Sequence, residues 1–408
     1  MGVDFPIWQF FQGLYTLTLD DPLVAGVRFL LIGLGFLLIY LGYRKTLEPL
    51  LMIPMGIGMI GVNAGVLIWD AGQTANLFVN ALVSEPEALL KVLQIDFLQP
   101  IYTFTFSNGL IACLVFMGIG AITDLDYLLA RPLMSMMIAV AAELGTILTL
   151  PIAVAAGLAP NEAASIALVG GADGPMVLYG SLRLAPELFV PITVVAYLYL
   201  SLCYAGYPYL IKLLIPKRLR GVEMDPAAVP EVSAGKKFAF CVIAMGILSL
   251  LFPVAAPLFA SFFVGVAVKE AGVTRYVEFL SGPVLYGSTF FLGFVLGALM
   301  NAQVILDPKV LLLLGLGMLA LLLSGIGGLI GGLIYYKVSK GKVNPLIGIA
   351  GVSCVPTTAK VAQKCASESN VFAMILPYAM GPCVAGVITT AIITGIYVTG
   401  VPHLVGGP

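Results

Sequence analysis

Two short stretches combine helix-breaking residues with polar side chains inside otherwise apolar sequence. They are Gly170-Gly171-Ala172-Asp173-Gly174-Pro175 and Gly351-Val352-Ser353-Cys354-Val355-Pro356. Glycine and proline loosen or end a helix and release backbone carbonyls. Non-helical backbone at membrane depth is tolerated only where protein or a water-filled cavity covers it. The two stretches therefore predict a pathway for an ion or a substrate.

Asp173 is the strongest candidate for an ion ligand. A carboxylate near the centre of a bilayer is unfavourable by about 2.5–3.5 kcal/mol on insertion scales, so it normally has a partner or lines a polar cavity. An ion pair with Arg183 is the structural alternative. Hard monovalent cations prefer oxygen ligands, which favours a sodium site over a transition-metal site. Besides freed carbonyls, the other candidate oxygen donors are Ser353, Asn344, Thr357, Thr358 and Tyr199.

Two more charged residues interrupt apolar runs. Lys360 follows Ser353 by seven residues. It either extends to the cytoplasmic interface or holds a carboxylated substrate by its charge. Glu143 lies in an apolar run with no motif around it, so a structural and a functional role are equally open.

Composition sets the class of protein that positions these residues. The chain has 408 residues, of which 60% are hydrophobic and 10% charged, whereas roughly a quarter are charged in soluble domains. This predicts an all-α polytopic membrane protein. A net charge of −1 argues against a nucleic-acid partner. The six cysteines are dispersed and His403 is the single histidine, so neither a disulfide framework nor a histidine metal site is expected. The N-terminus lacks the pattern of a cleavable signal peptide.

Apolar runs predict about 9 to 12 membrane segments. Basic residues near 44–45, within 212–237 and within 337–342 should face the cytoplasm, which makes 212–237 a cytoplasmic linker. If the two later clusters share a side, an even number of crossings separates them, which favours splitting the run at 238–268 at Pro253 and Pro257. The predicted segments lie near 29–43, 49–69, 97–123, 133–158, 163–182, 188–211, 238–268, 283–306, 310–336, 343–359 and 371–400.

The two halves of the chain resemble each other. Asp173 precedes Ser353 by 353 − 173 = 180 residues, and Tyr197 matches Tyr378 at a similar offset. Chance matching is a competing explanation, since 46 residues are glycine. We expect a single integral membrane domain over 1–408 with two inverted repeats, about 97–215 and about 283–400, whose broken helices meet at the ion site.

These motifs together resemble a known family. The GGADGP segment at 170–175, Tyr199, the segment at 344–356 and Met380-Gly381-Pro382-Cys383-Val384-Ala385-Gly386-Val387 are similar to the membrane-embedded beta subunits of sodium-pumping biotin-dependent decarboxylases. That family includes oxaloacetate, glutaconyl-CoA, methylmalonyl-CoA and malonate decarboxylases. The resemblance covers roughly residues 100–400, with the motifs in the same order.

The resemblance implies a multi-pass protein of the cytoplasmic (inner) membrane that decarboxylates carboxybiotin on a carrier subunit. The reaction would drive Na⁺ out of the cytoplasm and consume a proton from the far side. Implied partners are a carboxyltransferase subunit, the biotin carrier, a small membrane-anchoring subunit and further copies of the chain in a homotrimer. The implied site comprises sodium ligands Asp173, Ser353, Asn344 and Tyr199, carboxybiotin-binding Lys360 and Asn344, and catalytic Lys360 and Tyr199.

Two positions depart from the oxaloacetate branch of that family. Cys383 replaces an asparagine, which removes one possible sodium ligand, and Lys360 replaces an arginine, which keeps the charge but loses the bidentate fork. Both indicate another branch of the family. The alternative function is a sodium-coupled antiporter or organic-anion symporter without decarboxylase activity, and a scaffold subunit with no site of its own fits a buried aspartate poorly.

Overall fold

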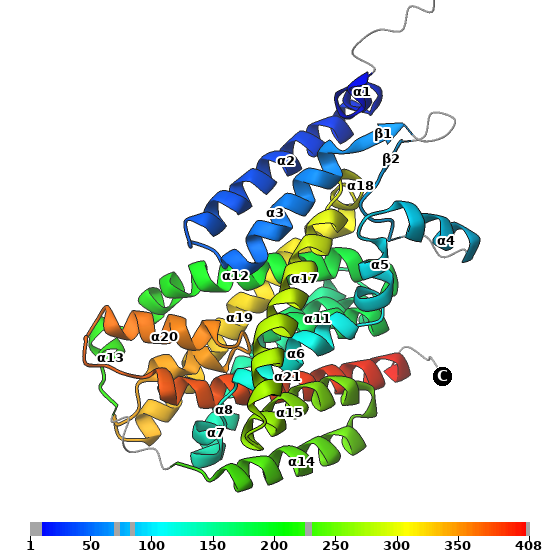
Figure 1. Ribbon diagram of the computed structural model, residues 1–408. Coiled ribbons are helices and arrows are strands. Elements are labelled where there is room, and N and C mark those ends of the chain that lie inside the picture. Colours follow the sequence, from blue (N-terminus) through cyan, green and yellow to red (C-terminus); the bar gives the residue numbers. More distant parts are fainter. Residues whose placement is uncertain (1–9, 69–73, 82–85, 225–230, 405–408) are drawn as a thin grey trace, which may run out of the picture. The chain divides into compact units, whose positions relative to one another are not determined.

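The computed structural model describes residues 10–68, 74–81, 86–224 and 231–404 (Figure 1). Residues 225–230 of the predicted cytoplasmic linker lie outside the described residues. Residue 69 of the predicted segment 49–69 and residues 1–9 also lie outside them. Contacts divide the chain into two compact units, Met1–Leu110 with Ser288–Leu312, and Ile111–Gly287 with Leu313–Pro408.

The first unit is built on a close pair of helices, α2 and α3. A Cβ on Gly56 would lie 2.6 Å from the carbonyl oxygen of Gly35, so glycine at this crossing lets the two backbones approach. A short antiparallel sheet pairs Val66 with Asn76. The elements are α1 (Gln12–Leu19), α2 (Pro22–Tyr43), α3 (Pro49–Ala64), β1 (Val66–Ile68), β2 (Thr74–Asn76), α4 (Pro86–Ile95), α5 (Gln99–Ile101), the π-helical η2 (Tyr102–Phe106) and α18 (Ala302–Ile305).

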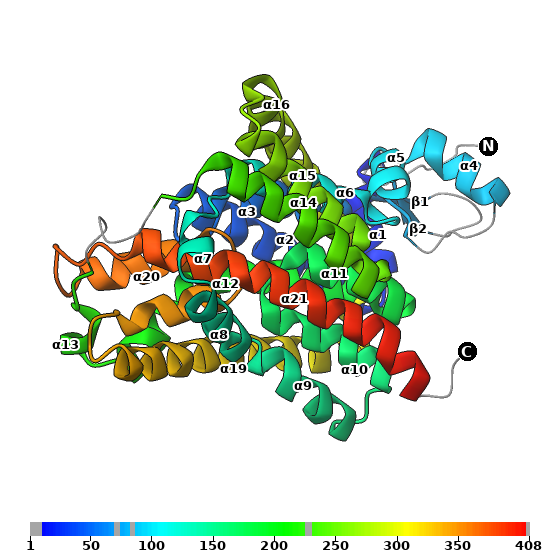
Figure 2. The same ribbon diagram turned by 90° about the horizontal axis from the view of Figure 1, so that it is seen from below.

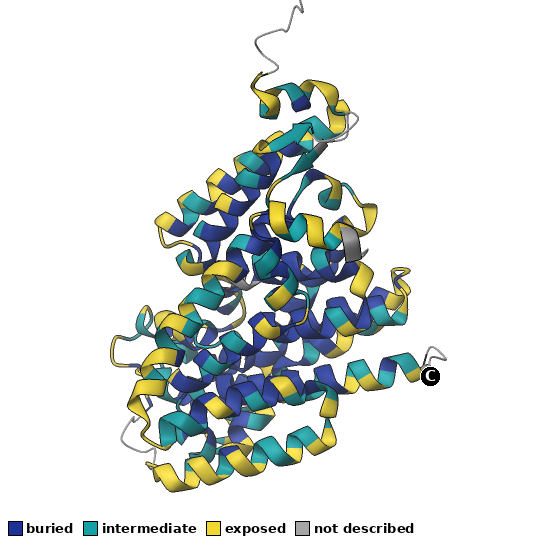
Figure 3. Ribbon diagram, turned by 45° about the vertical axis from the view of Figure 1, so that its right-hand side comes forward, coloured by how far each residue is buried: buried dark blue, intermediate teal, exposed yellow. Residues whose placement is uncertain are grey.

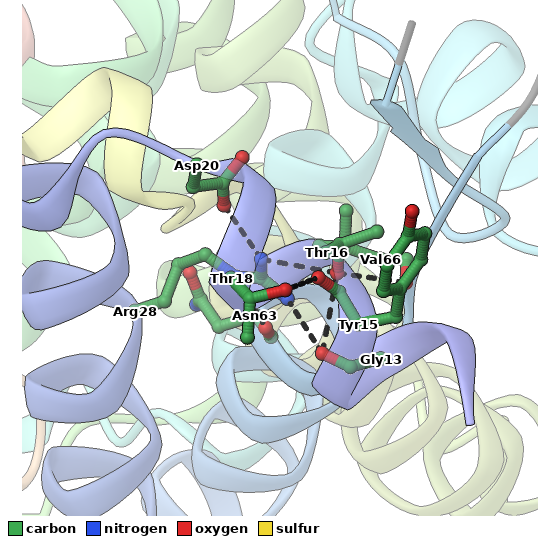
Figure 4. A network of polar contacts seen from close by, with 8 residues as sticks. All are labelled: Gly13, Tyr15, Thr16, Thr18, Asp20, Arg28, Asn63 and Val66. Atoms are coloured by element: carbon green, nitrogen blue, oxygen red, sulfur yellow. Dashed lines mark hydrogen bonds and ion pairs between the residues drawn. The ribbon is translucent and has the colours of Figure 1, made fainter. Parts of the chain in front are cut away.

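A buried arginine ties the first helices of this unit together (Figure 4). Arg28, in apolar α2, lies 2.6 Å from Asp20 through its guanidinium, and its Nε donates to the Asn63 carbonyl at 3.0 Å. A further bond joins it to the Thr16 hydroxyl. A buried charge that has both an ion-pair partner and hydrogen bonds is tolerated in a structural role. Arg28 therefore joins α1, α2 and α3 and is not a free cation.

The second unit holds the predicted site residues and most of the helices. Its elements are α6 (Leu110–Ile122), α7 (Asp126–Ala130), α8 (Pro132–Ala142), α9 (Leu144–Ala155), α10 (Pro160–Ala167), η3 (Leu168–Gly171), α11 (Gly174–Leu184), η4 (Pro186–Leu188), α12 (Phe189–Leu214), α13 (Lys217–Arg220), α14 (Ala234–Leu251), η6 (Pro253–Ala255), α15 (Ala256–Glu270), α16 (Thr274–Phe279), η7 (Leu280–Val284), η8 (Pro345–Gly351), α20 (Thr357–Ser367) and α21 (Leu376–Leu404). Helices α17 (Leu285–Leu299) and α19 (Pro308–Val338) contribute residues to both units, as does α6 through its first residue, Leu110.

The prediction of an all-α polytopic membrane protein is confirmed. Among the described residues, seven helices are long and apolar enough to cross a membrane, and nine if each of two bent pairs is one span. The predicted run at 238–268 splits at its prolines into Ala234–Leu251 and Pro253–Glu270. The predicted segment at 97–123 is a pair bent by 69°. The predicted segments at 163–182 and 343–359 are short helical pieces with breaks between them.

Many residues on the outer helices are exposed (Figure 3), and large hydrophobic residues are among them, as expected for contact with lipid. Helix α14 is an example, because Cys241 is its buried residue while Ile243 and Leu250 are 60% and 85% exposed. An apolar surface of this extent is unfavourable in water. The exposed faces of such helices are therefore suited to contact with the hydrocarbon of a membrane.

Glycine residues of α19 let other segments pack directly on its backbone. A Cβ on Gly327 would lie 2.2 Å from the Ala141 carbonyl oxygen of α8, and one on Gly332 would lie 2.1 Å from the Pro345 oxygen of η8. Gly331, four residues after Gly327, also meets Ala141, and Gly328, four residues before Gly332, meets Gly348 of η8. Small residues four apart on one helix face permit this approach in membrane proteins. Helix α19 therefore holds η8 against α8. The segment η8 precedes the non-helical stretch at 352–356.

Candidate functional site

Asp173 lies at the first break, between η3 and α11. The residue before it, Ala172, has a left-handed backbone with φ of 54°, an unfavourable conformation for a residue with a Cβ. This turn separates the two helical pieces. Asp173 is buried, and its Oδ1 accepts a hydrogen bond from the Met176 N–H at 3.2 Å. The carboxylate thus caps α11, where the positive end of the helix dipole favours negative charge.

Ser353 lies in the second break, between η8 and α20, and joins it directly to the first break. Its hydroxyl donates to Asp173 Oδ2 at 3.0 Å, and its N–H donates to the Gly171 carbonyl at 3.0 Å. Two segments 180 residues apart therefore meet at one carboxylate. The alternative partner Arg183 instead lies over the Tyr179 ring at 5.5 Å. Within the described part of the chain, Asp173 forms no ion pair.

Helix α21 closes one side of this junction and runs alongside α8 (Figure 2). A Cβ on Gly386 would lie 2.5 Å from the Gly351 carbonyl oxygen and 3.3 Å from Ser353 Cβ. Any larger residue at position 386 would displace the second break. The conformation of Ser353 therefore depends on a glycine of the segment 380–387.

Glu143 forms a second buried carboxylate group behind the first break. It lies between α8 and α9, and its Oε2 accepts a hydrogen bond from the Thr146 hydroxyl at 2.6 Å. The hydroxyl of Thr390 donates to Oε1. Both threonines also pack against glycines of the first break. A Cβ on Gly170 would lie 2.9 Å from Thr146 Oγ1, and one on Gly171 would lie 2.8 Å from Thr390 Oγ1. The sequence showed the acid within an apolar run but gave no indication of these partners.

Two tyrosines of α12 differ in their surroundings. The Tyr199 hydroxyl donates to the Leu314 carbonyl of α19 at 2.8 Å, and its role at the ion site stays a prediction. The Tyr197 hydroxyl is buried without a hydrogen-bond partner among the described residues. It lies beside the break, since a Cβ on Gly174 would be 2.8 Å from it. Sequence reasoning used Tyr197 as a repeat marker and missed it as a site residue.

Asn344 begins η8 and makes three hydrogen bonds to backbone groups. Its Oδ1 accepts from the Leu346 N–H at 2.9 Å, while Nδ2 donates to the carbonyls of Arg220 and Val222 at 2.9 and 2.8 Å. These bonds join η8 to the segment after α13. They do not reach Asp173, so a direct role for Asn344 at the ion stays a prediction.

The remaining predicted residues lie on or beside α20. Lys360 is exposed, and it forms no ion pair with any described residue. The Thr358 hydroxyl donates to the Val352 carbonyl at 2.8 Å and lies 3.8 Å from the Cys383 sulfur. Thr357 is partly exposed at the start of the helix. Thr358 and Cys383 thus border the second break, whereas Lys360 is available to a ligand from outside the chain.

This arrangement suits a hard cation. The junction offers carboxylate and hydroxyl oxygens together with the backbone of two breaks. Asp173 and Ser353 present oxygen atoms, and oxygen ligation is the chemistry that these residues supply.

Comparison with known proteins agrees with this chemistry. The family of the "Na+-transporting oxaloacetate decarboxylase beta subunit" matches residues 27–401. The chain belongs to this family. It is 55% identical over 393 residues to a carboxybiotin decarboxylase of Malonomonas rubra, covering 96% of this chain and 98% of that protein.

More distant members of the decarboxylase family align over nearly as much of the chain. An oxaloacetate decarboxylase beta chain of Salmonella typhi is 35% identical, with 92% of this chain and 97% of that protein covered. A methylmalonyl-CoA decarboxylase beta subunit of Veillonella parvula is 33% identical, with coverage of 90% and 91%. The higher identity to the Malonomonas rubra protein is consistent with a branch other than that of the oxaloacetate enzymes, as Cys383 and Lys360 predict.

Proposed function

We propose that this protein decarboxylates carboxybiotin on a carrier subunit and couples that reaction to Na⁺ export, with a proton consumed from the far side. Its membership of the decarboxylase family supports the reaction. The observation that carries the ion-pumping part is the hydrogen bond between Ser353 and Asp173, which joins two helix breaks at one buried carboxylate. A buried carboxylate at a helix break of a membrane protein is a candidate functional residue by default.

Asp173 and Ser353 are the proposed sodium ligands. The Ser353 hydroxyl now donates to one carboxylate oxygen. A bound Na⁺ would take that place, with Ser353 turning a lone pair toward the ion and Asp173 supplying the charge. This exchange alters the contact between the two breaks. Since a ligand shifts a conformational equilibrium only through differential affinity, coupling requires that Na⁺ and carboxybiotin favour different arrangements of the breaks.

Lys360 is the proposed residue that receives carboxybiotin. Its exposed ammonium at the start of α20 could hold the carboxylate by charge. Decarboxylation needs a dry site and a proton delivered to the ureido nitrogen as carbon dioxide leaves. Asn344 and Tyr199 are proposed to border the route of the ion and the proton, close to the segments that their hydrogen bonds now join.

The proposed assembly contains a carboxyltransferase, a biotin carrier, a small anchoring subunit and further copies of this chain in a trimer of the cytoplasmic membrane. Beta-subunit membership supports partner subunits in general. The basic residues of α13 support a cytoplasmic position for the segment after α12. Gel filtration with light scattering of the purified protein would test the trimer.

Substitution of the central carboxylate tests the proposal. Asp173→Asn nearly preserves shape but removes the charge, and we expect it to abolish Na⁺-stimulated decarboxylation of free or carrier-bound carboxybiotin and Na⁺ uptake into proteoliposomes. Asp307→Asn is the matched control, because Asp307 also caps a helix, through the Lys309 N–H, but is exposed. Retained pumping by Asp173→Asn would place the site elsewhere. Solute-coupled Na⁺ transport with no biotin enzyme and no decarboxylation would favour a secondary transporter.

A further inference from the structure

Glu143 is a buried carboxyl group with no ion-pair partner among the described basic side chains. It is 2% exposed and lies within the candidate span Pro132–Ala155, where an isolated carboxylate is strongly unfavourable. In its ionised form, Glu143 therefore requires a cation that is not part of the polypeptide.

Hydroxyl oxygens surround this carboxylate from two helices. Thr146 on α9 donates to Oε2, and Thr390 on α21 donates to Oε1. Thr389 Oγ1 also lies 3.5 Å from Oε1, but it is only 3.0 Å from the Gly386 carbonyl. Because a hydroxyl has one hydrogen, the shorter bond leaves the lone pairs of Thr389 free to share a cation with Oε1. The single negative charge of an ionised Glu143, surrounded by neutral hydroxyl oxygens, would balance the charge of one monovalent cation.

We propose that Glu143, with the hydroxyls of Thr146, Thr389 and Thr390, forms a second sodium site next to the Asp173 site. The proposal rests on the proposed function only in taking Na⁺ as the transported ion. The two sites share structure: Thr390 contacts Gly171 of the first break, while Gly386, one turn earlier on α21, contacts Ser353. A movement of α21 against the breaks therefore alters both sites together, which links the occupancy of one to the other.

Direct counting of bound ions tests this site. Equilibrium binding of ²²Na⁺ to the purified full chain should give two ions per chain for the wild type, and one for Glu143→Gln, Thr390→Val or Asp173→Asn. Thr390→Ser keeps the hydroxyl and should restore two. Thr394→Val is the matched control, because Thr394 is a buried threonine of the same helix that donates to the Thr390 carbonyl and not to Glu143. It should bind two.

The outcomes separate this inference from the proposed function. Unchanged stoichiometry in both Glu143→Gln and Thr390→Val would overturn the second site. One ion in the wild type that Glu143→Gln still binds would also overturn it, as would a Glu143→Gln variant in which only the pH dependence of activity changes, since the carboxyl would then hold a proton. If two ions bind but decarboxylation ignores Na⁺, the second site stands and the proposed coupling fails.

Discussion

At the scale of single residues, the Ser353 hydroxyl is the contact that makes one site from two breaks. We expect Ser353→Ala to raise the Na⁺ concentration for half-maximal decarboxylation by about tenfold, equivalent to about 1.4 kcal/mol, because the ion loses one oxygen ligand. Activity measured against Na⁺ concentration checks this. Ser135→Ala removes another buried hydroxyl, one that has no hydrogen-bond partner in the described chain, and should leave the requirement unchanged. An equal shift in both variants would contradict direct ligation by Ser353.

Single residues also show where sequence reasoning reached its limit. The charge of Asp173 in an apolar run and its spacing to Ser353 were enough to predict the junction. They were not enough to choose between Tyr197 and Tyr199. Helix positions two residues apart differ by about 200° and face nearly opposite sides. Which side faces the break depends on how α12 packs. The structure places the unpartnered hydroxyl of Tyr197 beside Gly174, while that of Tyr199 bonds to Leu314.

At the scale of elements, the glycines of α19 set how closely η8 can approach. A Cβ on Gly332 would lie 2.1 Å from the Pro345 oxygen, whereas one on Gly315 of the same helix meets nothing within 4 Å. We expect Gly332→Ala to destabilise the protein by about 1–3 kcal/mol, as overpacking usually does. Gly315→Ala should be neutral or stabilising by up to about 1 kcal/mol, because alanine favours helix. Thermal unfolding of the two variants in detergent measures the difference, and similar midpoints would contradict the packing argument.

Helix breaks were predictable where glycine or proline causes them. Pro253 separates two spans as expected, and the Gly170 and Gly351 segments interrupt theirs. The one-residue interruption at Glu143 has no such residue and was not predicted, although the predicted segment at 133–158 corresponds to the single candidate span Pro132–Ala155. There, α8 ends at Ala142 and α9 begins at Leu144. The side-chain bond from Thr146 to Glu143 and the contacts with α21 come from tertiary packing, which no local pattern contains. The internal repeat stays a prediction.

At the scale of the whole molecule, an ion cluster connects α7, α14 and α15 of the second unit. Lys237 Nζ lies 3.2 Å from Asp126 and 3.3 Å from Glu270. Burial raises the pKa of Asp126, but hydrogen bonds from the Val232 N–H and Lys237 outweigh burial and leave it below the usual 3.8. A lowered pKa means that this carboxylate stabilises the fold above its unfolded pKa, and that the stabilisation is lost as pH falls through the folded value.

The prediction concerns acid unfolding. We expect the thermal midpoint of the wild type to fall between about pH 5 and pH 3, and the Asp126→Asn variant to show a smaller fall from a lower starting midpoint, because the charge-dependent contribution is already absent. Asp21→Asn, which changes an exposed aspartate that caps α2, should follow the wild-type pH profile. Parallel profiles for wild type and Asp126→Asn would show that the cluster does not stabilise the fold through this carboxylate.

Ion binding should also stabilise the folded chain as a whole, since Asp173 belongs to two helix breaks that unfolding separates. A ligand that binds only the folded state at 100 times its dissociation constant adds about 2.7 kcal/mol per site. We therefore expect Na⁺ to raise the thermal midpoint of the wild type relative to choline at equal ionic strength. Asp173→Asn should lose the part of this shift that comes from its own site, while Asp307→Asn should keep the full shift. Because ionic strength is constant, screening of surface charges cannot produce the shift. The same midpoint for the wild type in both salts would contradict binding of Na⁺ to the folded protein, and with it the ligand role of the buried carboxylate.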